Sequence, residues 1–327
     1  MSDQPSTAQD PVERLIRAAG RRELPPAQAY ERALYAATDV WQQKVRHRRR
    51  RTFLSLAACV TALAVGIGVA MRSLESPTTA SEPVASVVRV IGSVQVRTAD
   101  ARDWTFVGEH SGPLSTGTVV QSASASSAAL RMGRVSLRVA SGTEVVLDSP
   151  SRLRLVRGTV YLDTGVTGAA GQMAVVTRAG TVTDVGTQFE VHYLESIYRV
   201  RVREGEVLLQ RDDGVRQGVA GQEISIDASG EVSTASIRPD DPAWGWVQAL
   251  ATAPDIDQQP LTVLLAWVSR ETGASIRYAT PAVERKATTT ILHGSIRHLT
   301  PFEALTVMLA TTDLRHELLA DGTIMIK

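Results

Sequence analysis

The feature that most constrains this chain is an uncharged apolar segment of 19 residues that extends from Phe53 to Met71. As an α-helix rising about 1.5 Å per residue, it would span about 28 Å, close to the hydrocarbon thickness of a bilayer. Six basic residues precede it: Lys44, Arg46, Arg48, Arg49, Arg50 and Arg51. The positive-inside rule then predicts one transmembrane helix anchored by these residues, with the N-terminus in the cytoplasm and residues 72–327 outside it.

Other interpretations of this segment fit less well. A buried core helix would not be flanked by so many arginines, and a signal peptide would not follow about 50 residues of chain. The basic run could bind nucleic acid, but beside a membrane span we expect it to contact inner-membrane lipids instead. The net charge of +1 adds no overall attraction for nucleic acid. We therefore predict no direct nucleic-acid partner.

The rest of the chain divides by composition. Residues 1–52 carry 11 Lys and Arg against 6 Asp and Glu, and two helical patterns separated by Pro25 and Pro26 predict a short helical cytoplasmic segment. The single cysteine, Cys59, lies in the predicted span, so the chain has no intrachain disulfide. Residues 72–84 are rich in Ser, Thr and Pro, which is typical of a linker.

Residues 85–240 alternate apolar and polar side chains in many short runs, such as Val135–Val139 and Tyr198–Val202. Glycine-containing turns separate these runs, for example at Ser141-Gly142 and Asp213-Gly214. This pattern predicts an antiparallel all-β domain, a sandwich or a roll. Arg and Ser occupy many of the alternate positions, which suggests that one face of the sheet is solvated.

Residues 241–327 predict a small α+β domain. Apolar residues at helical spacing from Leu261 to Val268 indicate a helix that Gly273 ends. We expect strands at Ser275–Tyr278 and at residues 288–296. Thr300-Pro301-Phe302-Glu303 has the sequence of a capping box and begins a second helix, and a hairpin ends the chain.

Two stretches of the β region resemble the core signature of the FecR (ferric-citrate regulator) family. They are Gly180–Val191, which reads GTVTDVGTQFEV, and Val202–Val207, which reads VREGEV. Leu155–Tyr161 is similar to the strand that precedes this signature in the family. The tail from Asp255 to Lys327 resembles the short domain at the N-termini of secretins and TonB-dependent receptors, the STN domain.

The resemblance implies cell-surface signalling in a Gram-negative bacterium. A TonB-dependent outer-membrane receptor, often for an iron carrier, contacts the periplasmic part, and the cytoplasmic part holds or activates an extracytoplasmic-function (ECF) sigma factor. The cytoplasmic segment is shorter than in typical members and contains one tryptophan, Trp41, so anti-sigma and pro-sigma action both stay open. The alternative is an envelope-anchored scaffold or interaction protein without a transcriptional role.

The resemblance also implies a candidate reaction at Gly186-Thr187. In several family members this bond is thought to cleave itself by an N-to-O acyl shift, and Asp184 is placed to accept a hydrogen bond or act as a base. The alternative is that Gly186 forms a turn or bulge that needs positive φ and that Thr187 is an ordinary strand residue. A single cleavage makes no turnover enzyme, so we predict that the chain is not an enzyme.

No other motif indicates catalysis or a cofactor. The six histidines include no pair with the helical i, i+4 spacing of a metal site, and no phosphate-binding or nucleophile motif occurs. We therefore predict no cofactor and no metal. Trp244, Trp246 and Trp267 cluster near the join of the two outer domains, where they either pack one domain on the other or form a partner-binding surface.

Overall fold

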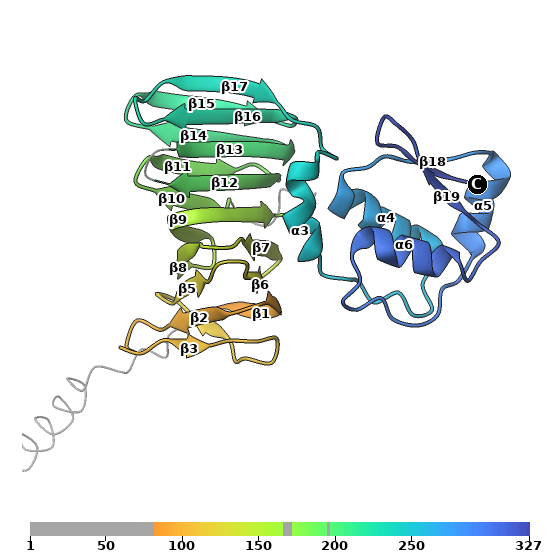
Figure 1. The fold of residues 1–327 in the computed structure, drawn as a ribbon, viewed down its shortest axis with the longest axis horizontal. Helices are drawn as coiled ribbons and strands as arrows, with labels where there is room; N and C mark the ends of the chain where they lie inside the picture. Colours follow the sequence, from red (N-terminus) through yellow and green to blue (C-terminus); the bar gives the residue numbers. More distant parts are fainter. Residues whose placement is uncertain (1–81, 166–171, 195–196) are drawn as a thin grey trace, which may run out of the picture. The chain divides into compact units, whose positions relative to one another are not determined.

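The computed structural model describes residues 82–165, 172–194 and 197–327, and these belong to one compact unit (Figure 1). The predicted transmembrane helix, its basic anchor and the cytoplasmic segment lie outside the described residues, so they remain predictions. Among the helices that are described, none is both long and apolar enough to cross a membrane.

Residues 83–236 form a large all-β domain, and its strands are predominantly antiparallel, as the alternation predicts. The strands are β1 (Pro83–Ile91), β2 (Val94–Arg97), β3 (Thr105–Phe106), β4 (Leu114–Ser115), β5 (Val119–Ser122), β6 (Ser127–Met132), β7 (Val135–Val139), β8 (Glu144–Ser149), β9 (Arg152–Asp163), β10 (Ala174–Thr177), β11 (Gly180–Asp184), β12 (Gln188–Leu194), β13 (Ile197–Glu204), β14 (Glu206–Arg211), β15 (Gly214–Val219), β16 (Gln222–Asp227) and β17 (Val232–Ser236).

β4 pairs with the start of β1, and the other strands form two sheets that share the long strand β9. Sheet I has the order β1-β6-β7-β9-β12-β13-β16-β17, and all of its pairs are antiparallel. Sheet II has the order β3-β2-β5-β8-β9-β10-β11-β14-β15, and only its β9–β10 pair is parallel. The N-terminal half of β9 lies in sheet II and its C-terminal half in sheet I, which ties the two sheets together.

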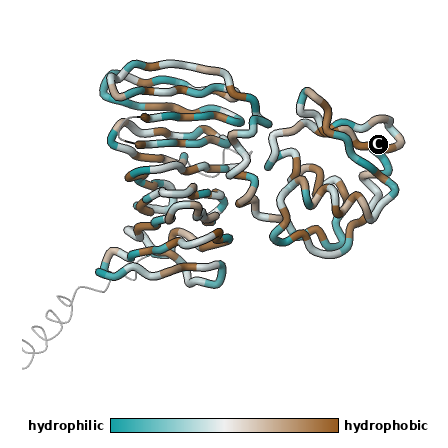
Figure 2. The backbone as a smooth tube through the Cα atoms, in the orientation of Figure 1, coloured by the Kyte–Doolittle hydropathy of each residue, from teal (hydrophilic) through white to brown (hydrophobic). Residues whose placement is uncertain are grey.

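The core of this domain lies between the sheets and is built from every second residue. In sheet I, Val139, Val160, Val191 and Val200 face one another across four strands and are fully buried. Figure 2 shows the resulting alternation of hydrophobic and hydrophilic residues along the strands. Burying each such side chain stabilises the fold by roughly 1.5–3 kcal/mol, so the alternation sets the register of the sheet.

The C-terminal part is α+β, as predicted, and has its own hydrophobic core. Its elements are the 3₁₀ helix η1 (Pro242–Trp244), α3 (Gly245–Ala249), α4 (Leu261–Thr272), β18 (Ile276–Tyr278), α5 (Pro281–Thr289), α6 (Pro301–Leu309), β19 (His316–Leu318) and β20 (Ile324–Ile326). β20 is the central strand of a three-stranded sheet and pairs parallel with β18 and antiparallel with β19.

Several local predictions for this part are confirmed. α4 ends at Gly273, which adopts a left-handed conformation with φ of 72°. At the start of α6 the Thr300 hydroxyl accepts a hydrogen bond from the Glu303 backbone N–H, and the Glu303 carboxylate accepts one from the Thr300 N–H, so the capping box is complete. The chain ends with the predicted hairpin of β19 and β20.

The predicted strand at residues 288–296 is wrong. Residues up to Thr289 belong to α5, and beyond it only Ile291 makes a single isolated bridge, to Pro260. The run of threonines suggested a strand because β-branched residues favour one. In the folded chain the Thr288 and Thr290 hydroxyls instead donate to carbonyl groups four residues earlier, which satisfies them within and just after the helix.

Candidate functional site

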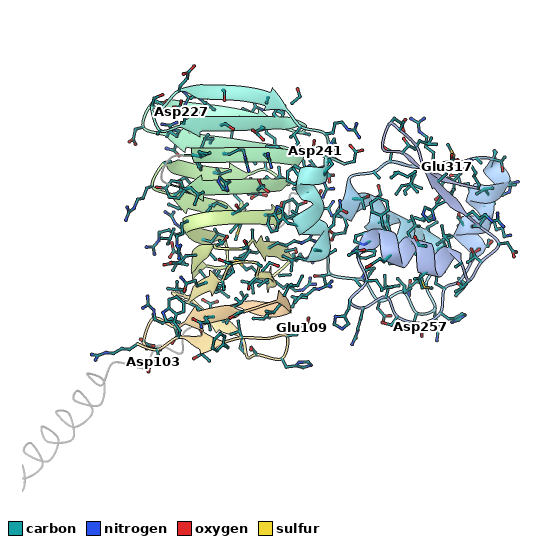
Figure 3. All side chains as sticks on the ribbon, in the orientation of Figure 1. Asp103, Glu109, Asp227, Asp241, Asp257 and Glu317 are labelled. Atoms are coloured by element: carbon teal, nitrogen blue, oxygen red, sulfur yellow. The ribbon has the colours of Figure 1, made fainter. Side chains whose placement is uncertain are left out.

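The outer face of sheet I carries a row of polar side chains in one cross-strand register: Arg138, Tyr161, Glu190, Arg201 and Glu223. The alternation suggested that such a face is solvated, and for the first three residues of this row that expectation is wrong. Arg138, Tyr161 and Glu190 are each 1% exposed, because η1, α3 and the C-terminal end of α4 lie over them. Figure 3 shows side chains filling the space between α3 and the strands.

Arg138 makes the most deeply buried of these contacts. Its Nη2 donates to the Glu271 carboxylate at 2.7 Å and its Nη1 donates to the Val247 carbonyl at 2.8 Å. The guanidinium also lies 5.4 Å from the centre of the Tyr161 ring. Burial alone would lower the pKa of Arg138, but the charge and hydrogen bond of Glu271 raise it above its usual value. One buried arginine therefore joins strand β7 to both α3 and α4.

Arg203 on β13 binds the C-terminal end of α4. Its Nη1 donates to the Glu271 carbonyl at 2.9 Å and its Nε donates to the Pro239 carbonyl at 2.7 Å. A cation at this position complements the partial negative charge of the last helical carbonyls. Gly273 follows directly, and a Cβ there would lie 2.2 Å from the Pro239 oxygen, so the close approach requires glycine.

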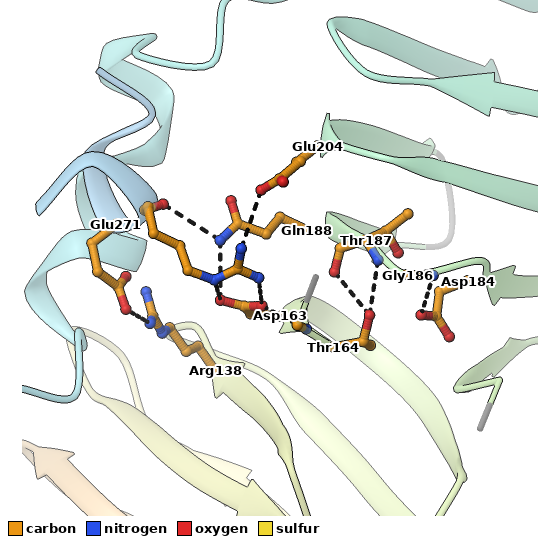
Figure 4. Close-up of polar contacts among 11 residues, drawn as sticks. Arg138, Asp163, Thr164, Asp184, Gly186, Thr187, Gln188, Glu204 and Glu271 are labelled. Carbon is orange, nitrogen blue, oxygen red and sulfur yellow. Dashed lines mark hydrogen bonds and ion pairs between the residues drawn. The ribbon is translucent and has the colours of Figure 1, made fainter. Parts of the chain in front are cut away.

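Asp163, at the end of β9, binds Arg270 of α4. The Arg270 Nε donates to Asp163 Oδ2 at 3.0 Å, its Nη2 donates to Oδ1, and its Nη1 reaches Glu204 at 3.3 Å. The Gln188 side-chain amide donates to the same carboxylate at 3.0 Å. Burial alone would raise the pKa of Asp163, but Arg270, Gln188 and the Gly165 N–H together hold it below its usual value. The carboxylate is therefore the charged centre of this contact (Figure 4).

The Gly186-Thr187 bond lies just before β12, in a tight turn. Gly186 has φ of 83°, and its N–H donates to Asp184 Oδ2 at 3.2 Å, so Asp184 accepts the hydrogen bond that its position predicted. The Thr187 N–H donates to the Thr164 hydroxyl at 2.8 Å, and that hydroxyl donates back to the Thr187 carbonyl at 3.1 Å (Figure 4). Thr164 thus holds both polar backbone groups of Thr187.

Two further features distinguish this bond. The Thr187 hydroxyl is buried and has no hydrogen-bond partner among the described residues. Gly205 packs against the bond so closely that a Cβ there would lie 2.5 Å from the Gly186 carbonyl oxygen. A buried hydroxyl without a partner costs free energy, and the Thr187 hydroxyl shares this state with several other buried side-chain atoms of the described residues.

The residues that hold the Gly186-Thr187 turn are direct chain neighbours of the residues that bind α4, both at the end of β9 and at the start of β12. Asp163, which binds Arg270, directly precedes Thr164, which binds Thr187. Gln188, which binds Asp163, directly follows Thr187, and its amide also lies 3.4 Å from the Arg270 carbonyl. The C-terminal end of α4 is therefore joined to the Gly186-Thr187 turn through one residue on each side.

The three tryptophans lie in different surroundings. Trp244 is fully buried, packs edge-on against Tyr161 at 5.9 Å and lies beneath Arg203. Trp246 is half-buried, and its ring N–H donates to Glu190 at 3.0 Å. Trp267 packs against the C-terminal core.

Sequence reasoning found Asp184, Gly186 and Thr187 but not the polar residues that bind α4. Arg138, Asp163, Arg203 and Glu271 occupy ordinary positions of the alternating or helical patterns. Nothing local separates Arg138 from an exposed strand arginine, because its partners lie 109 and 133 residues further along the chain.

The fold and site define a two-sheet β domain that holds a Gly-Thr turn with a buried threonine and binds a helical C-terminal part through the Arg138–Glu271 and Asp163–Arg270 ion pairs. Residues 118–208 match the family model FecR protein, and this range contains the turn. The resemblance to the FecR family is thereby confirmed. No curated protein matches the chain.

Two crystal structures of a proposed anti-sigma factor from Parabacteroides distasonis are similar to this chain. They are 16% and 15% identical in sequence, each covers 64% of this chain, and the alignments cover 97% and 98% of the respective solved chains. The TM-score is 0.36 in both cases.

Proposed function

We propose that this chain is a single-pass inner-membrane regulator that carries a periplasmic signal to an ECF sigma factor. The observation that carries the proposal is the FecR match over residues 118–208, which includes the Asp184–Thr187 turn. The uncharged segment Phe53–Met71 and the arginines before it support the membrane topology. In this scheme a TonB-dependent receptor, for example one that imports an iron carrier, contacts the STN-like C-terminal part in the periplasm.

The test is recovery of the sigma factor with the cytoplasmic segment. The tagged full-length chain is purified in detergent from its own bacterium beside a variant that lacks residues 1–43. This variant keeps the basic anchor Lys44–Arg51, so it inserts in the same orientation. We expect mass spectrometry to find an ECF sigma factor with the full chain only. Recovery of lipid and background proteins alone from both would support a scaffold and overturn the proposal.

We further propose that the Gly186-Thr187 bond cleaves itself once, as the resemblance implies. The Thr187 hydroxyl oxygen attacks the Gly186 carbonyl carbon, the C–N bond breaks, and the hydroxyl proton passes to the departing amine. Water then hydrolyses the ester, which leaves a carboxylate on Gly186 and a free amine on Thr187. The positive φ of Gly186 and the unpartnered Thr187 hydroxyl support this step.

Cleavage is tested on the purified full-length chain. We expect two fragments on a denaturing gel, with Thr187 as the new N-terminus, and one intact band for Thr187→Ala. Thr183→Ala serves as the matched control, because Thr183 lies on the neighbouring strand β11 and outside the turn. A single intact band for the unaltered chain would show that the turn is only structural.

A further inference from the structure

A second Gly-Thr bond of the β domain shares two local features with Gly186-Thr187. Gly117 has φ of 80° and Gly186 has φ of 83°. The hydroxyls of Thr118 and Thr187 are both buried, and neither has a hydrogen-bond partner among the described residues. A glycine with positive φ and a free threonine hydroxyl therefore do not single out Gly186-Thr187, and any specificity for this bond depends on its surroundings.

The backbone of the threonine is held differently in the two bonds. The Thr118 N–H donates to the Ser115 carbonyl at 3.1 Å, and the Thr118 carbonyl accepts from the Leu147 N–H at 2.9 Å, so main chain holds it on both sides. The Thr187 N–H instead donates to a side chain, the Thr164 hydroxyl, at 2.8 Å. Since the Thr187 nitrogen is the atom that departs in the proposed cleavage, Thr164 contacts a reacting atom.

Thr164 is linked in turn to α4. Its chain neighbour Asp163 accepts hydrogen bonds from the Arg270 Nε at 3.0 Å and from the Arg270 Nη2. The Gln188 amide, which follows Thr187, donates to the same carboxylate at 3.0 Å (Figure 4). An arginine that binds a carboxylate through two nitrogens fixes the orientation of both groups. One carboxylate thus links Arg270 to the neighbours of both Thr164 and Thr187.

The placement of these groups matters for the proposed reaction. A hydroxyl attacks a carbonyl carbon efficiently only when the two atoms are held about 3–3.5 Å apart and aligned, and a shift of about 1 Å can slow a reaction about 100-fold. The Thr164 hydroxyl holds both the N–H and the carbonyl of Thr187. Loss of the Asp163–Arg270 pair would free the end of β9 and would therefore move the bond relative to its attacking hydroxyl.

We propose that Arg270 is a positioning residue for the Gly186-Thr187 bond and acts through the carboxylate of Asp163. The bond then breaks only when α4 is docked on sheet I. This inference rests on the proposed cleavage and adds its regulation. Because α4 (Leu261–Thr272) follows the bond in the sequence, cleavage would mark chains whose C-terminal part has folded and docked. Gly117-Thr118, whose threonine is held by main chain, stays intact.

The test measures the cleavage rate of the full-length chain. The chain is synthesised in a cell-free system with phospholipid nanodiscs and radiolabelled methionine, which both fragments contain, and its conversion is followed on denaturing gels. We expect Arg270→Gln to slow cleavage about 10-fold or more. Arg270→Lys, which keeps the charge and one donor group, should recover part of the rate. In an Asp163→Asn chain, adding Arg270→Gln should cause no further slowing, because Arg270 acts through that carboxylate.

A second measurement separates positioning from a general loss of stability. The uncleavable Thr187→Ala chain keeps the amide of residue 187, and hydrogen exchange with mass spectrometry reports how well the Thr164 hydroxyl holds it. We expect Arg270→Gln in this chain to raise exchange at residue 187 about 10-fold. The amide of Val200, on β13 in sheet I, should exchange at an unchanged rate.

Arg154→Gln is the matched control, because Arg154 also pairs with an aspartate, Asp148 at 2.8 Å, but on the exposed face of sheet II. It should cleave at the rate of the unaltered chain. An unaltered chain that stays intact would overturn the proposed cleavage and this inference with it. Where the unaltered chain is cleaved, four results would each overturn the positioning role alone: an equal cleavage rate for Arg270→Gln, equal exchange at residue 187, equally faster exchange at Val200, or a fragment that begins at Thr118.

Discussion

The two outer faces of the β domain have the same sequence pattern and opposite surroundings. On sheet I, Arg138 is 1% exposed and binds Glu271 at 2.7 Å. On sheet II, Arg154 occupies an equivalent alternating position, but its side chain is 54% exposed and binds Asp148 at 2.8 Å. The difference shows that alternation places a side chain on the outer face of its sheet, away from the core between the sheets. It does not determine whether water or another part of the chain covers that face.

The consequence is energetic as well as geometric. An exposed ion pair contributes little because water already solvates both charges well. A buried ion pair has lost that solvation, so removing one partner leaves a charge without compensation. The same arginine-carboxylate distance therefore carries different weight on the two faces, and the following substitutions measure that difference.

The largest effect is expected for Arg138→Ala. This change leaves the Glu271 carboxylate buried without its partner, so the free energy of unfolding should fall by about 3–5 kcal/mol. Arg154→Ala on sheet II should cost only about 0–1 kcal/mol. Urea denaturation of both variants gives the comparison, and similar losses would show that the two faces do not differ.

Gly273→Ala tests the close approach of α4 to sheet I. The alanine would have to keep a left-handed backbone conformation, and its Cβ would lie 2.2 Å from the Pro239 oxygen. We therefore expect the free energy of unfolding to fall by about 3 kcal/mol. Gly230, in the β16–β17 turn, also has positive φ but has open space around it. Gly230→Ala should therefore cost about 1 kcal/mol. Thermal denaturation distinguishes them, and equal costs would contradict a tight contact at Gly273.

The Asp163–Arg270 contact should make the attachment of α4 sensitive to acid. Because the folded state lowers the pKa of Asp163, its stabilisation is complete above the unfolded pKa of about 3.9 and is lost as the pH falls through the folded pKa. Asp163→Asn should therefore destabilise the protein by about 1.5–3 kcal/mol at pH 7 and by less near pH 3.

Hydrogen exchange of the α4 amides across this pH range measures the effect. Asp148→Asn on sheet II is the control, and it should change stability by about 0–1 kcal/mol because its partner Arg154 is exposed. A cost of Asp163→Asn that stays constant from pH 7 to pH 3 would contradict a charged Asp163 in this contact.

The smallest effect is expected for Thr164→Val. Valine keeps the shape of the side chain but leaves the buried Thr187 N–H without an acceptor, which should cost about 1–2 kcal/mol. Thr183→Val on sheet II should change stability by less than about 0.5 kcal/mol, because Thr183 is partly exposed on a strand that favours β-branched residues. Chemical denaturation measures the stability of both variants. An unchanged stability for Thr164→Val would show that the hydrogen bond between Thr187 and Thr164 does not stabilise the turn.

The resemblance to the FecR family made part of the site predictable. Gly186, Thr187 and Asp184 were found because they lie in the stretch that resembles the family's core signature, and the positive φ of Gly186 and its hydrogen bond to Asp184 were then seen in the structure. Thr164 was missed, because its bond to Thr187 joins residues 23 positions apart. The strand expected at residues 288–296 did not form, since β-branched threonines favour a strand but their hydroxyls can also be satisfied inside a helix.

By itself, the sequence determined what depends on neighbouring residues: the alternation that builds the all-β domain, the end of α4 at Gly273 and the capping box at Thr300. Only the tertiary structure decided that one outer face is covered and that Arg138 and Asp163 hold α4 there. The physical reason is that periodicity reports which side of an element is apolar, whereas the burial of a charge depends on partners more than 100 residues away.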